Sequence, residues 1–176
     1  YRGEWRQGMM WGEGELSWPS GGRYTGQFRK GLFHGRGVRV WHNGDKYSGE
    51  FEAGEQSGSG TFWDSAGGWV FAGDWLQGRM YGRGRVEWPG GAAYVGEWAD
   101  GIREGHGRLT WPDGSWYEGP FARNRVEGQG RKGFADGAWF EGQFLDGEFH
   151  GRGTFHWPDG TEFEGLWRGS DIEGPG

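Results

Sequence analysis

The sequence contains no cysteine, which excludes disulfides, thiolate nucleophiles and cysteine-bound zinc. It has no apolar run approaching the roughly 20 residues of a membrane-spanning helix, no signal-peptide pattern and no Asn-x-Ser/Thr glycosylation acceptor. Hydrophobic residues make up only 33% of the chain. Together these absences favour a cytoplasmic protein.

A low hydrophobic content is typical of disordered chains, but disordered chains are also poor in aromatics. This chain has 14 Trp, 12 Phe and 6 Tyr, and they recur at fixed spacing together with many of its 42 Gly. An aromatic residue two positions before a glycine recurs every 23 residues, with a single step of 24, at Tyr1, Tyr24, Tyr47, Phe71, Tyr94, Tyr117, Phe140 and Phe163. Such a period is the signature of a repeat protein.

Counting each of these aromatics as repeat position 1, glycine holds positions 3, 12 and 14 in all eight copies. The sequence therefore predicts one repeat array over residues 1–176. Its units are 1–23, 24–46, 47–70, 71–93, 94–116, 117–139 and 140–162, followed by a partial unit 163–176. Because the chain begins at a repeat's first residue and stops within a repeat, we expect it to be part of a longer chain.

Each unit has the pattern of a β-hairpin. Positions 1–6 alternate aromatic or glycine with charged residues, as a strand does, and Gly8 to Gly12 is predicted to form the first turn. A second strand follows, and then a turn such as Pro112-Asp113-Gly114. Asn124 replaces glycine at position 8, which predicts left-handed backbone there. Arg39 and Lys132 replace the apolar residue of position 16.

One hairpin buries too little apolar surface to fold alone, so the units must stack on one another. The predicted fold is all-β, an elongated, twisted, single-layer antiparallel sheet of consecutive hairpins. In this arrangement we expect the aromatic rings to stack across the glycines of the next unit.

The frame Tyr94-x-Gly96-x-Trp98-x-x-Gly101-x-x-x-Gly105-His106-Gly107, closed by Asp113-Gly114, resembles the MORN (membrane occupation and recognition nexus) repeat over essentially the whole chain. The resemblance implies a β-solenoid-like sheet of hairpins whose aromatic groove docks proteins, and for which phospholipid contact has also been proposed. Similar arrays occur in radial spoke and other ciliary proteins, junctophilins, plant lipid kinases and a histone methyltransferase. The repeat itself implies no reaction.

No group of polar residues is expected to converge into a catalytic or metal site. His34 and His150 share a repeat position but lie five units apart, and the other histidines occupy unrelated positions. We therefore predict no enzyme activity, no cofactor and no metal.

The aromatic face is the first candidate for partner binding. Positions 1, 5 and 18 are expected to lie on one side of the sheet, where they either stack only on one another or form a groove for a peptide or helix. The candidate residues are Tyr24, Phe28, Trp41, Trp75, Trp88, Tyr94, Trp98, Trp111, Tyr117, Phe121, Phe144 and Trp157, with Phe71, Phe134 and Phe140 on the same face.

The predicted first turn is the second candidate, because exposed Met and aromatic side chains suit adaptable binding. The alternative is that these side chains fold back and cap the sheet. The residues are Met9, Met10, Trp11, Leu32, Phe33, Met80, Tyr81, Ile102 and Phe149, with His34 and His150 beside them.

The charge pattern favours a protein partner over a membrane or nucleic acid. The formal net charge is -6, and the sign changes from unit to unit, so no continuous basic face is expected. The second unit is the basic one and supplies the candidate contacts for anionic lipid, Arg29, Lys30, Arg36, Arg39 and Lys46.

These observations predict a non-enzymatic scaffold that binds other proteins through its aromatic groove, within a larger, self-associating, ciliary (axonemal) or cytoskeletal assembly. Two alternatives stay open. One is a peripheral tether to membrane phospholipid through the second unit, and the other is an accessory repeat domain of a larger enzyme. No nucleic acid partner is expected.

Overall fold

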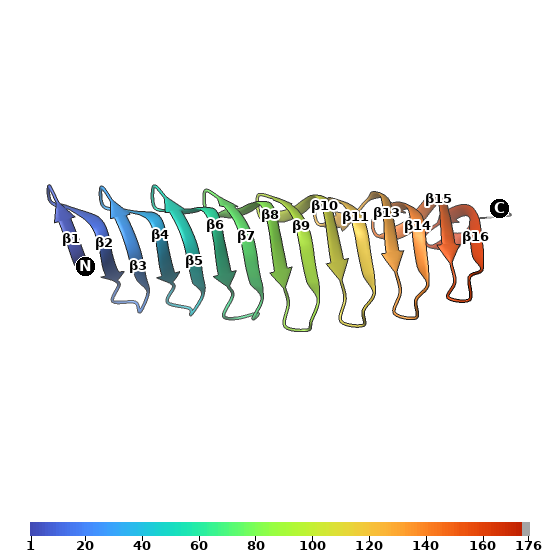
Figure 1. Ribbon diagram of the computed structural model, residues 1–176, viewed down its shortest axis with the longest axis horizontal. Helices are drawn as coiled ribbons and strands as arrows, with labels where there is room; N and C mark the ends of the chain where they lie inside the picture. The colour runs from blue at the N-terminus through green and yellow to red at the C-terminus, as the bar shows by residue number, and fades with distance from the viewer. Residues whose placement is uncertain (174–176) are drawn as a thin grey trace. The chain divides into compact units, whose positions relative to one another are not determined.

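The computed structural model describes residues 1–173 and contains strands and turns but no helix within that range. The chain divides into two compact units, Tyr1–Pro89 and Gly90–Gly176. The strands of the first unit are β1 (Arg2–Arg6), β2 (Met9–Ser17), β3 (Arg23–Arg29), β4 (Leu32–Val40), β5 (Lys46–Glu52), β6 (Glu55–Trp63), β7 (Val70–Leu76) and β8 (Arg79–Glu87) (Figure 1). The last residues of the predicted partial repeat, 174–176, lie outside the described range.

The strands of the second unit are β9 (Ala93–Ala99), β10 (Ile102–Thr110), β11 (Trp116–Ala122), β12 (Arg125–Val126), β13 (Gly128–Gly133), β14 (Trp139–Leu145), β15 (Glu148–His156), β16 (Glu162–Arg168) and β17 (Asp171–Ile172). In both units each strand pairs antiparallel with neighbours in the sequence, and β11 pairs with both β12 and β13. The predicted all-β fold of consecutive antiparallel hairpins is confirmed.

The first turn of each hairpin is shorter than predicted. It consists of positions 7 and 8 alone, and both have positive φ, as Gln7 (51°) and Gly8 (74°) illustrate. This is the backbone signature of a two-residue type I′ hairpin turn. Asn124 at position 8 has φ 68°, so the predicted left-handed conformation is confirmed. The prediction that the turn extends to Gly12 was wrong, because Met9 already begins strand β2.

Gly12 instead marks a β-bulge within β2. The pairing register of β1 and β2 shifts between Gly3 and Glu4, and Gly12 has φ 62°. The side chain of position 4 supports this bulge: Glu4 Oε1 accepts a hydrogen bond of 3.1 Å from the backbone N–H of Glu13. Gln27 and Asp74 do the same in their repeats. The acidic or amide residue at position 4 thus has a structural role.

The sixth repeat lacks this support, because Pro120 stands at position 4 and offers no side-chain acceptor. The Glu127 N–H, at position 11, still donates to the Pro120 carbonyl at 3.2 Å. At this point the second strand of the hairpin is divided into β12 and β13. The interruption of the strand therefore coincides with the loss of the usual bulge acceptor.

Backbone hydrogen bonds also fasten each type I′ turn to the preceding repeat. The N–H of position 8 donates to the carbonyl of position 10 one repeat earlier, for example from Gly31 to Met10 at 2.9 Å and from Gly54 to Phe33 at 2.9 Å. In the second unit Asn124 donates to Arg103 at 3.0 Å. These main-chain bonds help to hold successive repeats in one register whatever side chain stands at position 10.

The core is the row of position-1 rings. Tyr24, Tyr47, Tyr94 and Tyr117 are fully or almost fully buried, as are Phe71 and Phe140. Each ring lies over the cross-strand glycine pair of its own repeat, so that a Cβ added at Gly26 or Gly37 would overlap Tyr24. We had expected rings to stack across the glycines of the next unit, and that expectation was wrong. Glycine is required at positions 3 and 14 because the ring occupies the space of a side chain.

Candidate functional site

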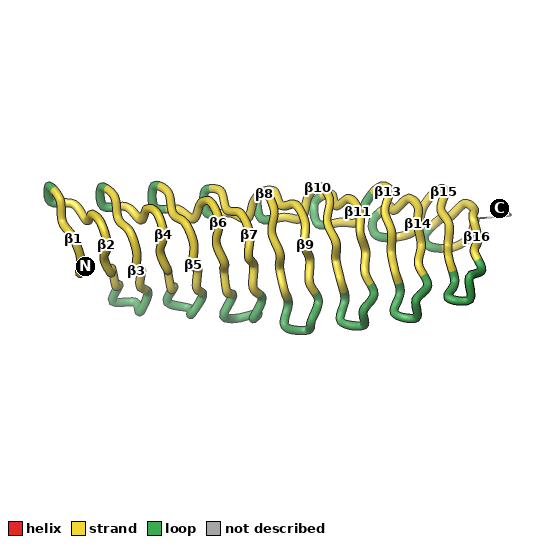
Figure 2. Tube along the Cα trace, viewed as in Figure 1, coloured by secondary structure: helices red, strands yellow, loops and turns green. Residues whose placement is uncertain are grey.

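The two faces of each unit differ in what they carry. We call the face with the position-1 side chains the inner face, and the opposite one the outer face. Because side chains alternate along a strand, positions 1, 3 and 5 and positions 10, 14 and 16 point to the inner face. The loops that follow β2, β4, β8, β10, β13 and β15 carry position 18 and lie along one edge of each unit (Figure 2).

Edge-to-face ring contacts connect the repeats beneath this inner face. The ring at position 1 meets the position-5 ring of its own repeat and that of the following repeat, as Tyr24 does with Phe28 and Phe51 at 5.0 and 5.1 Å. In the second unit Tyr117 contacts Phe121 and Phe144 at 5.3 and 5.0 Å. The position-1 hydroxyl donates to the position-4 carbonyl, at 2.9 Å for Tyr24 and Gln27. Burial raises the pKa of the Tyr94 hydroxyl to about 12.

Most of the aromatic residues predicted to contact a partner are therefore core residues. The structure buries Tyr24, Phe28, Trp75, Tyr94, Trp98, Tyr117, Phe121 and Phe144. Phe71 and Phe140, which we placed on the same face, are buried as well. Their rings hold the sheet together and present almost no surface to another molecule.

The accessible part of the predicted set is position 18. The rings of Trp41, Trp88 and Trp111 are half-buried, and 41% of Trp157 is exposed. Trp18 and Phe134 occupy the same position and are also half-buried. We call the three of these residues in each unit the aromatic row of that unit: Trp18, Trp41 and Trp88 in the first, and Trp111, Phe134 and Trp157 in the second. The turn that carries Trp41 is held by backbone hydrogen bonds: the Trp41 N–H donates to the Asp45 carbonyl at 2.9 Å, and the Trp41 carbonyl accepts from the Gly44 N–H at 3.0 Å.

The residues of the predicted turn edge lie in strands and divide between the two faces. Position 10 points inward: Phe33 stacks on Tyr24 with ring centroids 3.9 Å apart, and Phe149 stacks on Phe140 at 3.8 Å. Met10 and Met80, also at position 10, are half-buried. For position 10 the alternative of side chains that cap the sheet describes the observed packing.

Positions 9 and 11 belong to the outer face. Met9, Leu32 and Tyr81 are exposed by 39%, 50% and 47%, while Trp11 and Ile102 are half-buried. Arg6 lies over the Trp11 ring at 5.0 Å. His34 and His150 stand at position 11. These residues therefore do not form one continuous surface with position 10.

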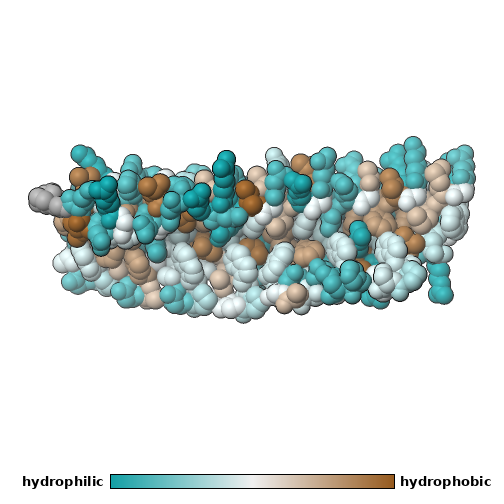
Figure 3. Space-filling view, turned by 180° about the vertical axis from the view of Figure 1, so that it is seen from behind, coloured by the Kyte–Doolittle hydropathy of each residue, from teal (hydrophilic) through white to brown (hydrophobic). Residues whose placement is uncertain are grey.

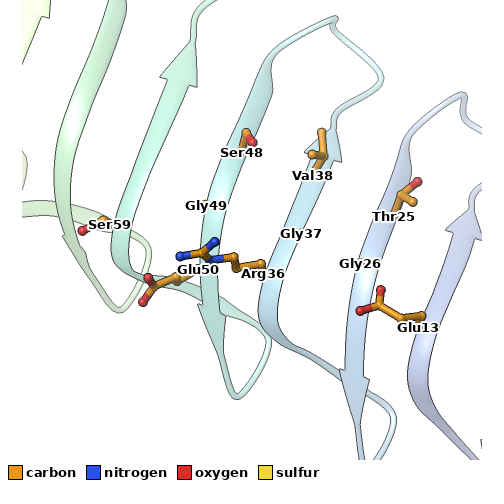
Figure 4. Close-up of a pocket in the computed structure, with 10 residues that line it drawn as sticks. All are labelled: Glu13, Thr25, Gly26, Arg36, Gly37, Val38, Ser48, Gly49, Glu50 and Ser59. Carbon is orange, nitrogen blue, oxygen red and sulfur yellow. The ribbon is translucent and has the colours of Figure 1, made fainter.

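The predicted basic cluster is likewise divided. Arg29, Arg36 and Lys46 are exposed outer-face residues and Lys30 is in the turn, whereas Arg39 points to the inner face. On the outer face the Arg36 and Glu50 side chains point toward each other across paired strands (Figure 4). They line a trough of about 520 Å³ together with small side chains such as Thr25 and Ser48. Mixed charge in this trough does not favour a polyanion.

Other outer-face arginines are paired with acids. Arg108 contacts Glu118 at 2.7 Å and Arg125 contacts Asp146 at 2.6 Å, and Arg131 forms an ion pair with Glu141. On the side drawn in Figure 3, strongly apolar side chains form small separate patches among hydrophilic ones. These three outer-face arginines thus have acidic partners within the chain.

The inner face carries a contrasting feature that the sequence had marked only as a departure from the repeat. Arg39 lies over Trp18, Phe33 and Trp41, with its guanidinium carbon 4.7 Å from the Trp41 ring centroid. Lys132 lies near Trp111, Phe134 and Phe149, and its Nζ is 5.4 Å from the Phe134 centroid. Each compact unit thus has a cation within its aromatic row.

The described residues include no buried polar or charged side chain and no group of three His, Cys, Asp or Glu residues placed to hold a metal ion within residues 1–173. Within the same range no helix has the length and apolar character needed to cross a membrane. The feature best suited to recognition in each unit is its aromatic row with its cation, because these rings are half-exposed and the cation lies among them.

Comparison with known proteins identifies the repeat. The model of the MORN repeat family matches residues 1–23, 24–46, 47–69, 71–93, 94–116 and 140–162. Segment 117–139, which contains the divided strand after Pro120, is outside these matches. No curated protein has a matching sequence.

The fold is similar to solved structures of low sequence identity. One is the SAS-4 (dCPAP) TCP domain of Drosophila melanogaster, in complex with a proline rich motif of Ana2 (dSTIL). It is 14% identical with a TM-score of 0.54, over 87% of this chain and 83% of that chain. Another is the TCP10 domain of Danio rerio CPAP in complex with a peptide of STIL, at 14% identity and a TM-score of 0.44, over 88% and 83% of the two chains. At such identity the likeness is one of fold.

Proposed function

The chain belongs to the MORN repeat family, and from this premise we propose that it is a scaffold module that binds an extended segment of a partner protein along the aromatic row of a unit. The observation that carries the proposal is the separation of the aromatic residues by burial. From the second repeat to the seventh the rings of positions 1 and 5 are buried in the core, while position 18 keeps half-exposed rings on the same face. Half-exposed Trp rings in fixed loops are typical anchors for partner residues.

An extended segment fits this arrangement better than a helix. The rings come singly from separate repeats, with Asp64 in place of a ring in the third repeat, and they lie at the loop edge of the strands. A polyproline II segment docks against aromatic side chains and loses little conformational entropy on binding. The SAS-4 domain of similar fold is in complex with a proline rich motif. That complex motivates a proline-rich probe for this chain.

The proposal assigns no catalytic role to these residues and requires no cofactor. We further propose that the module works in the cytoplasm, within a cytoskeletal, centriolar or ciliary assembly. The absence of cysteine, which suits a reducing compartment, supports the cytoplasmic part. Immunofluorescence of the tagged full-length protein tests the location, and a secreted or organelle-lumen signal would contradict it.

The binding proposal is tested with an array of 12-residue peptides whose flanking positions vary among proline, leucine and alanine. Trp41→Ala with Trp111→Ala removes one ring from the aromatic row of each unit, and we expect at least a tenfold loss of affinity for the best peptides in fluorescence polarisation. The control is Trp63→Ala with Trp116→Ala. These are half-buried rings of the outer face, covered by Lys46 and Arg108.

Equal losses in the two double variants would contradict the inner face as the site. A set of peptides with stabilised helical conformation is included in the array. Binding by helical peptides alone would contradict the extended mode. Binding of no peptide by the unaltered chain would refute the function. Circular dichroism before and after substitution shows whether each variant keeps the fold.

A further inference from the structure

Arg39 and Lys132 hold the same repeat position in two different repeats, one in each compact unit. At position 16 the other described repeats have Leu16, Phe62, Val86, Leu109 and Phe155. An apolar residue is therefore compatible with this site wherever the backbone repeats. The sheet therefore does not require a cation at this position.

The two cations have equivalent surroundings. Each lies between the position-18 ring of the preceding repeat and that of its own repeat. For Arg39 these rings are Trp18, at 5.7 Å from the guanidinium carbon, and Trp41, at 4.7 Å. For Lys132 they are Trp111 and Phe134, whose centroids are 5.8 and 5.4 Å from Nζ.

A position-10 ring completes each site, and it comes from the same repeat as Arg39 but from the repeat after that of Lys132. Phe33 lies 5.6 Å from the Arg39 guanidinium carbon, and Phe149 lies 6.0 Å from Lys132 Nζ. Both cationic side chains are half-buried by these rings. Three aromatic rings thus surround one cation in each unit, an arrangement that the outer-face arginines do not share.

Neither cation makes an ion pair or a hydrogen bond with another residue of the described range 1–173. Asp113 lines a hollow of about 390 Å³ together with Trp111, Pro112, Ser115 and Lys132. Asp113 Oδ1 accepts hydrogen bonds from Ser115, at 2.9 Å from its N–H and 2.6 Å from its hydroxyl. Its carboxylate is engaged within the turn.

Cation–π attraction covers only part of what such a group needs. A guanidinium has five N–H donors and an ammonium has three, and the faces of aromatic rings satisfy none of them as a carboxylate does. Burial among the rings lowers the pKa of Arg39 from its ordinary value by desolvation. The outer-face cations Arg108 and Arg125 do have their acids, at 2.7 and 2.6 Å. The contrast within one chain indicates that the acceptor for Arg39 and Lys132 comes from elsewhere.

We propose that Arg39 and Lys132 are carboxylate-binding subsites of the aromatic rows of their units, which select an extended peptide with an acidic side chain flanked by apolar residues. This inference rests on the proposed function, because it specifies the peptide that each row binds. The carboxylate accepts hydrogen bonds from the cation, and the flanking residues pack on the rings at either side. Arg39 presents a planar fork that binds a carboxylate through two parallel bonds, so its site discriminates more strongly than the point charge of Lys132.

The test uses the peptide array described above with three matched arms, in which the central residue is glutamate, glutamine or lysine. Because a hydrogen bond between two charged groups is stronger than one to a neutral amide, we expect the glutamate peptides to bind about tenfold more tightly than the glutamine peptides, and the lysine peptides to bind least. Raising the salt concentration lowers the preference, since the rim of the site is open to solvent.

The variants Arg39→Leu and Lys132→Leu place leucine at position 16, where the first and fifth repeats already have Leu16 and Leu109, so we expect both variants to fold. In the double variant we expect glutamate and glutamine peptides to bind equally, with binding of the apolar flanks preserved. The matched controls are Arg29→Leu and Arg152→Leu, which remove exposed outer-face arginines from the same two units and should leave the preference unchanged.

The outcomes separate this inference from the function on which it rests. If the unaltered chain binds glutamate and glutamine peptides equally, or if the preference survives in the double leucine variant, the carboxylate subsites are refuted and the peptide-binding function stands. If the control variants remove the preference as fully as the double variant does, net charge rather than the aromatic row is responsible. If no arm binds, the function itself fails.

Discussion

Replacement of Gly60 by alanine tests the most basic relation in this sheet, that between the position-1 ring and the glycines beneath it. Gly60 is the position-14 glycine of the third repeat and pairs with Gly49 across the strands. The three atoms nearest to a Cβ placed on Gly60 all belong to the Tyr47 ring, well inside van der Waals contact. Gly60 is not among the residues with positive φ, so its backbone tolerates alanine and the penalty is steric.

The ring has little freedom to move away. Tyr47 is fully buried, and its hydroxyl donates to the Glu50 carbonyl at 3.0 Å. Overpacking of a fixed core typically costs 1–3 kcal/mol, and here we expect a loss of about 3 kcal/mol in the free energy of unfolding. For a chain of this length that corresponds to a decrease in Tm of about 6 to 12 °C.

The matched control is Gly90→Ala. An added Cβ at Gly90 has no neighbour within 4 Å, and this glycine also lacks positive φ. Alanine at such a site restricts the unfolded chain, and we expect stabilisation of about 0.4 to 1 kcal/mol. Opposite signs for the same chemical change at Gly60 and Gly90 would isolate the contribution of the ring.

A double-mutant cycle with Tyr47→Val completes the test. Tyr47→Val is itself destabilising because it leaves a cavity, but it removes the ring atoms that a methyl group on residue 60 would meet. Adding Gly60→Ala to this background should change the stability by less than about 1 kcal/mol, which gives a coupling of about 2 kcal/mol. Urea unfolding is followed by tryptophan fluorescence and by circular dichroism, because coincidence of the two transitions is needed before free energies are compared in a repeat protein. An equal Gly60→Ala penalty with and without the ring would refute the argument.

Three further predictions address the turn, the phenol and the surface pairs. Asn124→Ala should lower the free energy of unfolding by about 1 to 2 kcal/mol in urea, because φ at this site is 68° and Asn124 Oδ1 accepts a 2.8 Å hydrogen bond from the Arg103 N–H. Asn124→Gly should lower it by less, because glycine adopts this φ without strain. Equal effects of Ala and Gly would contradict the backbone reasoning. Burial raises the pKa of Tyr94 from 10.0 to about 12, so the stability that its protonated hydroxyl contributes is fully present below pH 10 and is lost as the pH rises toward 12. Tyr94→Phe should flatten this decline of the unfolding free energy at alkaline pH. An unchanged slope would show that Tyr94 ionises freely in the folded chain. Arg108→Ala should lower the free energy of unfolding by less than about 1 kcal/mol despite the 2.7 Å ion pair with Glu118, because both side chains are about half exposed. A decrease above about 2 kcal/mol would show that the pair is far better shielded from solvent than its exposure indicates.

The strands and the repeat frame could be predicted because glycine and aromatic residues mark them in every copy. The limits of the first turn could not. Position 7 is left-handed in each repeat, yet its residues include Gln7, Lys30 and Ala53, none of which indicates positive φ in a sequence. The conformation belongs to the two-residue type I′ turn that joins the paired strands, because Gln7 adopts it in the first repeat, where no earlier repeat is bonded to Gly8.

Burial within the aromatic face was also beyond the sequence pattern. Tyr94 and Trp111 are both aromatic residues of the inner face, but Tyr94 is fully buried and Trp111 is half-buried. The difference arises because the Gly12-type bulge and the strand that begins at position 9 bring position 10 over the position-1 ring. Phe33 does this in the second repeat and Arg103 does it in the fifth, where its guanidinium lies 5.5 Å from the Tyr94 centroid. Because the sequence pattern placed position 10 in a turn, it did not predict that the position-10 side chain packs over the position-1 ring.

The main-chain hydrogen bond between position 8 of one repeat and position 10 of the repeat before it joins the repeats without constraining which side chain stands at position 10. Because the atoms involved are common to all amino acids, the position-10 side chain is free to change from Phe33 to Gln56 to Val126 without loss of the linkage. A whole repeat inserted or deleted within a unit would meet the same donor and acceptor at its borders. Under the proposed function, the number of repeats in a unit then fixes the spacing between its recognition residues, so that a bound segment has to match this spacing as well as the chemistry of the rings.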